Sequence, residues 1–180
     1  MDLDKISPHK LKTLSEEVLR KDLVIPLLKE IEAQNVTDMH GPSEKGIDVY
    51  FETYDIFGHK RRFGMQVKTI DIVQEGQAGK GNIITIMNQI EMAFSNSIVF
   101  GTSEKGREEV YIDGFYILTS GKVSPNAARY IREKRNKYPY VYIIDGDETL
   151  RIIRNRKFLK RRILEIPIGS PLSVSGNKIA

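Results

Sequence analysis

The chain has 180 residues, enough for one domain with a hydrophobic core and short for two. It contains no cysteine, so disulfides, thiolate zinc sites and cysteine nucleophiles are excluded. The three histidines, His9, His40 and His59, lack the close spacing of zinc ligands. Any metal ion must therefore be held by oxygen.

The chain shows no sign of membrane insertion or export. No apolar run approaches the length that a membrane span requires, and the first four residues include Asp2 and Asp4 where a signal peptide would be basic. We therefore expect a cytoplasmic protein without a membrane partner.

Positive charge is concentrated in the last third. The formal net charge is +4, which by itself is weak evidence for a polyanionic partner. Between Lys122 and Arg162, however, thirteen basic residues stand against four acids, a local excess of nine. Two interpretations stay open, namely solvated helix faces or a surface that contacts nucleic acid.

The first elements are predicted from hydrophobic period. Apolar residues in 11–31 recur mostly at three and four, and Ser15 and Pro26 indicate two helical pieces or one kinked helix. After a loop at residues 40–43, alternating residues in 46–54 and 62–70 predict two strands. The turn around Phe57-Gly58-His59 makes them an antiparallel hairpin.

Residues 74–81 form a polar, glycine-rich stretch. It is no phosphate loop, because neither Gly-Lys-Ser nor Gly-Lys-Thr ends it and no suitably spaced strand precedes it. Residues 83–94 then predict a helix with an apolar stripe, and residues 97–109 a surface excursion.

The last third alternates strands and helices. Residues 115–119 predict a buried strand, Ser124 caps a helix that opens with Pro125 and runs to Arg135, and residues 140–144 predict another strand. The acids after Asp145 favour a turn and the cap of a short helix over metal ligands. We expect an α/β domain over residues 1–162 and a linker or flexible tail over 163–180.

Polar residues stand in the hairpin where a strand pair should be purely structural. Asp48 begins the first strand, and Gln66 and Lys68 lie near the end of the second. A three-residue loop Phe57–His59 would place Asp48 opposite Lys68 and on the face of Gln66, while Met65 and Val67 point into the core.

These residue types suit phosphodiester hydrolysis. The Asp48 carboxylate, the Gln66 amide oxygen and the backbone carbonyl of Val67 are hard ligands of the kind that Mg²⁺ or Mn²⁺ prefers. Lys68 would orient the nucleophile or stabilise the transition state, and Glu44 would act as an outer ligand through water. An acid from the first helix could complete the cluster: Asp22 or, less favoured, Glu17 or Glu30. The alternative is that Asp48 and Lys68 form only a cross-strand ion pair.

The motif Glu44-Lys45-Gly46-Ile47-Asp48, followed by Gln66-Val67-Lys68, resembles the PD-(D/E)XK nuclease superfamily in its Mrr-like restriction endonuclease form, with Gln in place of the usual acid. Residues 87–94, 114–121, the helix from Ser124 and residues 141–146 look like the family's later elements, so the resemblance spans residues 11–158. It implies a restriction-endonuclease-like αβββαβ core with a mixed central sheet flanked by helices. It also implies metal-dependent DNA cleavage in restriction or genome defence, with Asp48 and Gln66 as metal ligands, Lys68 as the catalytic lysine and Glu44 as a further site residue.

A second hypothesis is an inactive nuclease-like module that binds nucleic acid or docks a partner protein. We expect a homodimer for double-strand cleavage. Further domains stay open, because the chain ends in a Pro-, Gly- and Ser-rich stretch.

Overall fold

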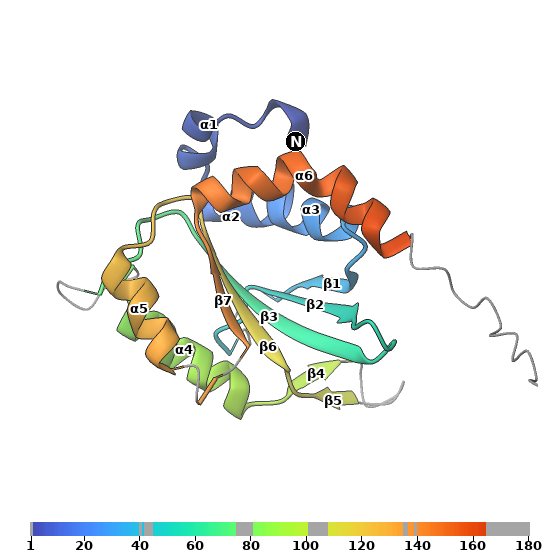
Figure 1. The fold of residues 1–180 in the computed structure, drawn as a ribbon. Coiled ribbons are helices and arrows are strands. Elements are labelled where there is room, and N and C mark those ends of the chain that lie inside the picture. Colours follow the sequence, from blue (N-terminus) through green and yellow to red (C-terminus); the bar gives the residue numbers. More distant parts are fainter. Residues whose placement is uncertain are drawn as a thin grey trace, which may run out of the picture.

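The computed structural model describes residues 2–39, 41, 45–74, 81–100, 108–134, 137–138 and 140–164, without the side chains of 157–164. Its centre is a five-stranded mixed sheet with the strand order β1-β2-β3-β6-β7 (Figure 1). The strands are β1 (Gln34–Asp38), β2 (Val49–Tyr54), β3 (Lys60–Lys68), β6 (Gly114–Thr119) and β7 (Val141–Ile144). The first three pair antiparallel, and β6 and β7 continue the sheet parallel to β3.

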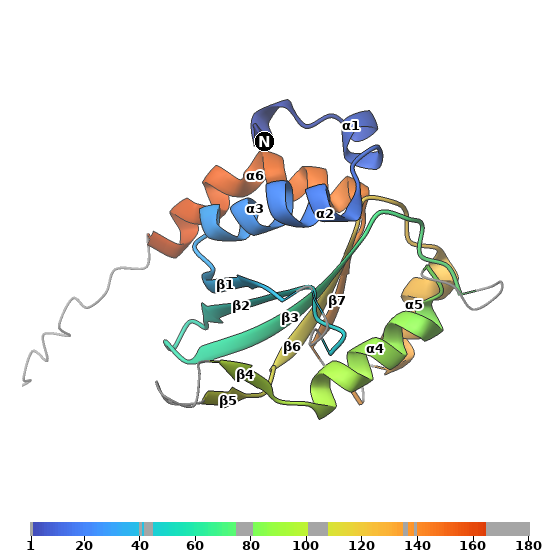
Figure 2. The same cartoon turned by 180° about the vertical axis from the view of Figure 1, so that it is seen from behind.

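Helices cover both faces of this sheet, as the two opposite views show (Figures 1 and 2). One face carries α2 (Glu16–Val18), η2 (Leu19–Val24), α3 (Ile25–Glu30) and α6 (Gly146–Leu164). The short helices η1 (Leu3–Lys5) and α1 (Pro8–Lys12) pack on the outer side of α6. The other face carries α4 (Ile83–Ser95) and α5 (Pro125–Glu133). Alternation along the strands separates two cores. Tyr50, Phe115 and Ile117 belong to the core beside α4, whereas Val49, Met65 and Val67 belong to the core beside α3 and α6. The α/β prediction is confirmed, and so is the inward position of Met65 and Val67.

The first helical run is continuous from Glu16 to Glu30, after a separate short α1. Ser15 caps it, since its Oγ accepts a hydrogen bond from Val18 N at 3.3 Å. The six residues of η2 form wide π-type turns directly before Pro26. Pro26 has no N–H for the usual helical bond, and the wider turns accommodate that loss without a sharp break.

Two segments differ from their prediction. Residues 97–109 are not only a surface excursion, because β4 (Ile98–Phe100) and β5 (Glu108–Val110) form a separate two-stranded sheet that buries Ile98 and Val110. The helix after Asp145 is not short, since α6 runs for 19 residues. It begins as predicted, with Asp145 Oδ1 accepting a hydrogen bond from Glu148 N at 2.8 Å. Ser124 likewise caps α5 by accepting from Ala127 N.

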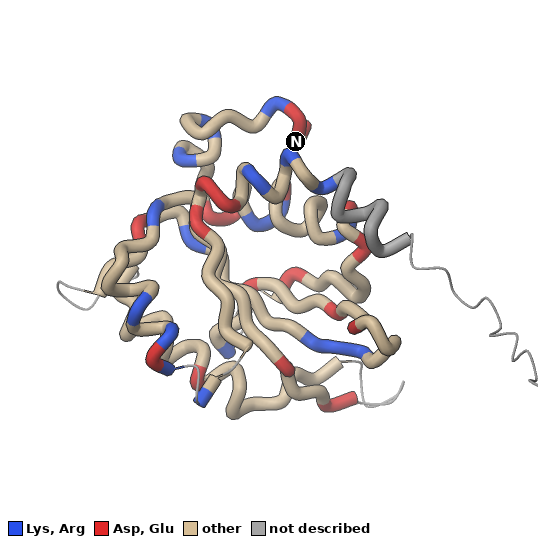
Figure 3. Tube along the Cα trace, in the orientation of Figure 1, with Lys and Arg blue, Asp and Glu red and all other residues tan. Residues whose placement is uncertain are grey.

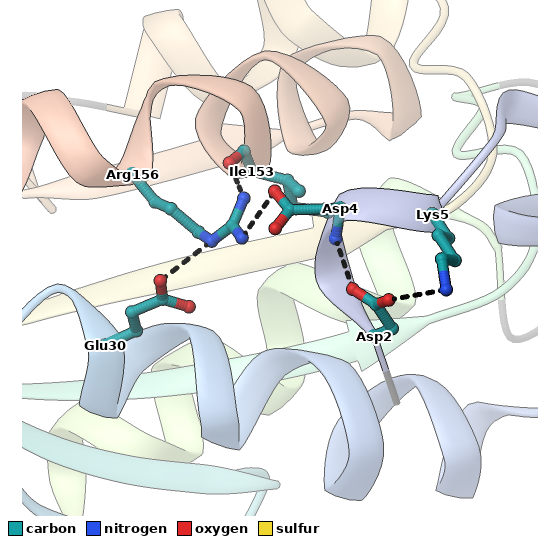
Figure 4. A network of polar contacts seen from close by, with 6 residues as sticks. All are labelled: Asp2, Asp4, Lys5, Glu30, Ile153 and Arg156. Atoms are coloured by element: carbon teal, nitrogen blue, oxygen red, sulfur yellow. Dashed lines mark hydrogen bonds and ion pairs between the residues drawn. The ribbon is translucent and has the colours of Figure 1, made fainter.

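Arg156 ties the N-terminal segment to the helical layer (Figure 4). It is 5% exposed, and its guanidinium donates to Asp4 Oδ1 at 2.7 Å, to Glu30 Oε1 at 2.9 Å and to the Ile153 carbonyl at 2.6 Å. Three elements distant in sequence, η1, α3 and α6, thus meet at one planar group with fixed donor directions. Glu30 therefore has Arg156 as its partner.

Replacing Arg156 with alanine should therefore destabilise the fold. Hydrogen bonds to charged groups contribute about 1.5–3 kcal/mol, and the partly exposed Asp4 and Glu30 side chains can regain water, so we expect a loss of about 2 kcal/mol. Urea unfolding measures it. Arg151→Ala is the control, since Arg151 pairs with Glu148 at the surface. Equal midpoints for the two variants would contradict the role given to Arg156.

No helix among the described residues combines the length and the apolar character that crossing a bilayer demands.

Candidate active site

The hairpin has a different register from the predicted one. Val49 pairs with Met65 and Tyr54 with Lys60, so the position opposite Asp48 is Gln66 rather than Lys68. The loop is residues 56–58, because Asp55 N donates to His59 O and the Asp55 carboxylate accepts from Phe57 N and His59 N, each at 2.9 Å. Gly58, at φ 79°, supplies the left-handed turn position. Moving the loop by one residue shifts the pairing by two, and the faces are therefore preserved.

Asp48 lies at the junction between the incoming loop and β2. It is 5% exposed, and its Oδ2 accepts a hydrogen bond from Val67 N at 2.8 Å while its own N–H donates to Met65 O at 2.9 Å. At the end of β3 the Asp48 carboxylate thus accepts the hydrogen bond from Val67 N–H that a backbone carbonyl of the neighbouring strand would otherwise accept. Each carboxylate oxygen can accept more than one contact, so this hydrogen bond orients Asp48 without exhausting it as a ligand.

Gln66 presents a buried amide oxygen at the same place. The residue is 2% exposed, and its Nε2 donates to Gln89 Oε1 of α4 at 2.8 Å. Its Oε1 is buried and has no hydrogen-bond partner in the part of the chain that the structure describes. Such an atom costs free energy unless something binds it, so the amide oxygen fits a ligand position for a hard cation.

Gln89 is a residue that the sequence analysis missed. The pattern of α4 indicated only an apolar stripe, and no signal in the sequence distinguishes Gln89 from the exposed polar residues beside it. Its helix lies close to the loop before β2, since a Cβ on Gly46 would come within 2.6 Å of Gln89 O. The close approach brings the Gln89 side chain to Gln66 and fixes which way the Gln66 amide points.

Lys68 ends β3 with 9% of its surface exposed. Its Nζ lies 3.8 Å from Glu16 Oε1, at the start of α2. Glu16 is therefore the first-helix acid at this end of the sheet, and it was not among those considered. Of the three that were, Glu17 pairs with Lys21, Glu30 pairs with Arg156, and Asp22 is exposed. The ion pair holds the ammonium at the strand end.

Glu44 falls outside the described residues, and its predicted role stays a prediction. Within the described part, no three acidic or histidine side chains gather as a metal-binding group. The ligands predicted from the sequence are of another kind, namely one carboxylate from Asp48, one amide oxygen from Gln66 and the backbone carbonyl of Val67. Oxygen donors with so little charge fit a hydrated Mg²⁺ or Mn²⁺ that takes further oxygens from its substrate.

A second polar cluster on the same face of β2 has a structural role. Glu52 accepts hydrogen bonds from Tyr50 Oη at 2.8 Å and from Asn35 Nδ2 at 2.6 Å, and Lys60 Nζ lies 3.1 Å away. Burial alone would raise the pKa of Glu52, but the hydrogen bonds from Tyr50, Lys60 and Asn35 outweigh it and lower the pKa. Since Asn35 belongs to β1, this charged network fastens the edge strand to β2.

Among the described side chains of the last third, basic residues alternate with acidic ones. Figure 3 shows acidic segments among the basic ones on α5 and α6. Several cations are paired within the chain: Arg129 with Glu133, Lys137 with Glu91, Arg151 with Glu148, and Arg156 with Asp4 and Glu30. For these described residues, the charge counted along the sequence overstates the positive charge that is available to nucleic acid.

Removing the Gln89 side chain should weaken the metal site that the sequence predicts. In Gln89→Ala the Gln66 amide loses the contact that orients it, and loss of such a supporting contact costs about 10- to 100-fold in metal affinity or activity. The DNA cleavage that the sequence predicts should therefore need a higher Mn²⁺ concentration in this variant. Asn88→Ala, an exposed neighbour on α4, is the control. The positioning role fails if both variants respond to Mn²⁺ like the parent.

Comparison of the chain with protein-family models, with curated proteins and with solved structures found no match.

Proposed function

We propose that the chain is a metal-dependent endonuclease of the PD-(D/E)XK type, Mrr-like and with the Gln-x-Lys variant of the motif. One observation carries the proposal: Gln66 Oε1 is buried and has no hydrogen-bond partner among the described residues, and the two chain neighbours of Gln66, Met65 and Val67, both hydrogen-bond to Asp48. A purely structural Asp–Lys ion pair gives no reason to bury an amide oxygen without a partner. Apart from the separate β4–β5 sheet inserted between α4 and β6, the order α3-β1-β2-β3-α4-β6 also follows the αβββαβ order that the resemblance implies.

Asp48 and Gln66 would hold the metal ion, with the Val67 carbonyl as a further ligand and Glu44 as an outer ligand through water. Mg²⁺ or Mn²⁺ bound there supplies Lewis-acid activation of water and of the phosphate. The chain's own contribution is positioning. Val67 N–H orients Asp48, Gln89 orients Gln66, and Glu16 holds the Lys68 ammonium at the strand end. Lys68 then lies where an ammonium can stabilise charge that develops on the phosphate.

The charge of this site predicts that metal and DNA bind together. Gln66 is neutral where the usual motif has an acid, so the described ligands carry little negative charge to attract a cation. A phosphate oxygen of DNA would add negative charge beside Asp48. We therefore place metal binding largely in the DNA complex.

The test is incubation of supercoiled plasmid with the protein in Mn²⁺ or Mg²⁺, beside a sample in EDTA. Nicked or linear DNA with metal and intact plasmid in EDTA would support the proposal. Intact plasmid with every divalent metal would overturn it. DNA binding without cleavage would instead favour the second candidate, an inactive binding module. The ion pairs that engage several described basic residues give that candidate no specific support.

The product also tests assembly. A homodimer has two sites and can cut both strands in one encounter, giving linear DNA early, whereas a monomer gives nicked circles first. A role in restriction or genome defence, in the cytoplasm and with DNA as the substrate, belongs to the same proposal.

A further inference from the structure

A small notch lies at the carboxyl ends of the parallel strands, outside the proposed catalytic residues. Its volume is about 20 Å³, and the polar part of its lining comes from three segments, contributing Lys12, Ser120, Gly121, Lys122, Gly146 and Asp147. The notch thus joins α1, the turn after β6 and the start of α6. In both views α1 lies over the start of α6 (Figures 1 and 2). Crevices at such strand ends are where open α/β sheets bind ligands.

Ser120 supplies the observation that points to a ligand. The residue is 1% exposed, and its Oγ is buried with no hydrogen-bond partner among the described residues. Its backbone N–H donates to Lys68 O at 3.0 Å. Ser120 is therefore the direct neighbour of the proposed catalytic lysine, one strand further along the sheet.

The start of α6 forms one wall of the notch. Its first turn is acidic, and the Glu148 N–H already donates to Asp145 Oδ1 at 2.8 Å, so this helix end gives the notch its shape rather than free donors. Gly146 brings this end close to Ser120, since a Cβ there would lie 2.5 Å from Ser120 O. Its N–H donates to Gly121 O at 2.9 Å. The notch wall is thus built from backbone held in close contact.

Charge in the lining favours an anion, with one opposing group. Lys12 and Lys122 come from segments far apart in sequence, and Asp147 lies in the same lining. All three are exposed, so their side chains can reach a ligand bound outside the notch. A volume of about 20 Å³ admits one oxygen atom and not a whole phosphate group.

We propose that this notch binds one non-scissile phosphate of a nucleic acid backbone, with a phosphate oxygen against Ser120 Oγ and the two lysines at its outer side. The inference rests on the proposed function, because the occupied notch would position the strand next to Lys68. It names a binding contact, so its test does not depend on cleavage.

The experiment measures binding of a short DNA duplex in EDTA as a function of salt concentration. Each phosphate contact contributes about 0.9 to the slope of log affinity against log salt. Lys12→Gln combined with Lys122→Gln should make the slope shallower by about that amount. Asp147→Asn should act in the opposite direction and tighten binding. Lys29→Gln, an exposed lysine of α3, is the control.

Opposite effects of the lysine and aspartate variants distinguish binding from a loss of folding, which would weaken both. Slopes equal to that of Lys29→Gln, or an Asp147→Asn variant that binds more weakly, would overturn the proposal. Saturable binding of inorganic phosphate alone at low millimolar concentration would overturn the assignment to a nucleic acid backbone. If the parent fails to cut with Mn²⁺ while the slopes change as expected, cleavage is refuted and the notch is not. Cleavage with unchanged slopes refutes the notch alone.

Discussion

Lys68→Ala should abolish plasmid cleavage while the protein stays folded. Lys68 ends β3 on the same face of the strand as Gln66, and in the proposed mechanism its ammonium stabilises the transition state. Removing one such group costs about 100- to 1,000-fold in rate. Its ion-pair partner, Glu16, has a side chain that is 36% exposed. Water can therefore solvate Glu16 in the variant, and the loss of the ion pair should change stability little.

The matched control is Lys21→Ala. Lys21 lies in η2, which continues the helical run that begins with Glu16, and it pairs with Glu17 at the surface. Both variants lose one lysine and one ion pair, so they change net charge and nonspecific DNA attraction equally. Time courses on supercoiled plasmid in Mn²⁺, with circular dichroism melting curves, compare them. Parent-like cleavage by Lys68→Ala would remove Lys68 from the catalytic site.

Asp48→Asn should give an equally inactive protein by a different route. An asparagine carbonyl can still accept the hydrogen bond from Val67 N, so the end of β3 should keep its geometry. What the change removes is the negative charge that the proposed metal ion needs. Cleavage should fall to background, and higher Mn²⁺ concentrations should restore at most part of it.

Asp113→Asn is the control for this change. Asp113 Oδ2 also accepts a backbone hydrogen bond, from Arg62 N at 2.7 Å, and the residue lies just before β6. Cleavage titrations with Mn²⁺ should separate the two variants, with Asp113→Asn following the parent. An active Asp48→Asn variant would contradict metal binding by Asp48. Unchanged DNA binding by both Asp48→Asn and Lys68→Ala, with an inactive parent, would favour the binding module.

Helix starts and the hairpin could be predicted from the sequence, because capping residues and alternating strand residues act through contacts with near neighbours in the chain. Ser124 before Pro125 marks the start of α5, Asp145 marks the start of α6, and alternation in residues 46–54 and 62–70 marks the hairpin. Each depends on contacts within a few residues, such as a side-chain oxygen that accepts a backbone N–H in the first helical turn. Such contacts can be read from spacing alone.

The hairpin register lies at the boundary of what spacing can predict. Glycine and a polar cluster located the turn, but whether the loop began at Ile56 or at Phe57 depended on hydrogen bonds from Phe57 and His59 to the Asp55 carboxylate. The predicted face of each strand residue is still correct, because strand side chains alternate with a period of two. The predicted cross-strand partner of Asp48, Lys68, is wrong.

The sequence by itself determined the α/β class, the order of most elements and the presence of Asp48, Gln66 and Lys68 on one hairpin. Only the tertiary structure decided which residues meet them: Gln89 from α4, Glu16 from α2 and Ser120 from the end of β6. The reason is physical. Hydrophobic period and capping are local, whereas these contacts form between segments that become neighbours only when helices pack on both faces of a mixed sheet.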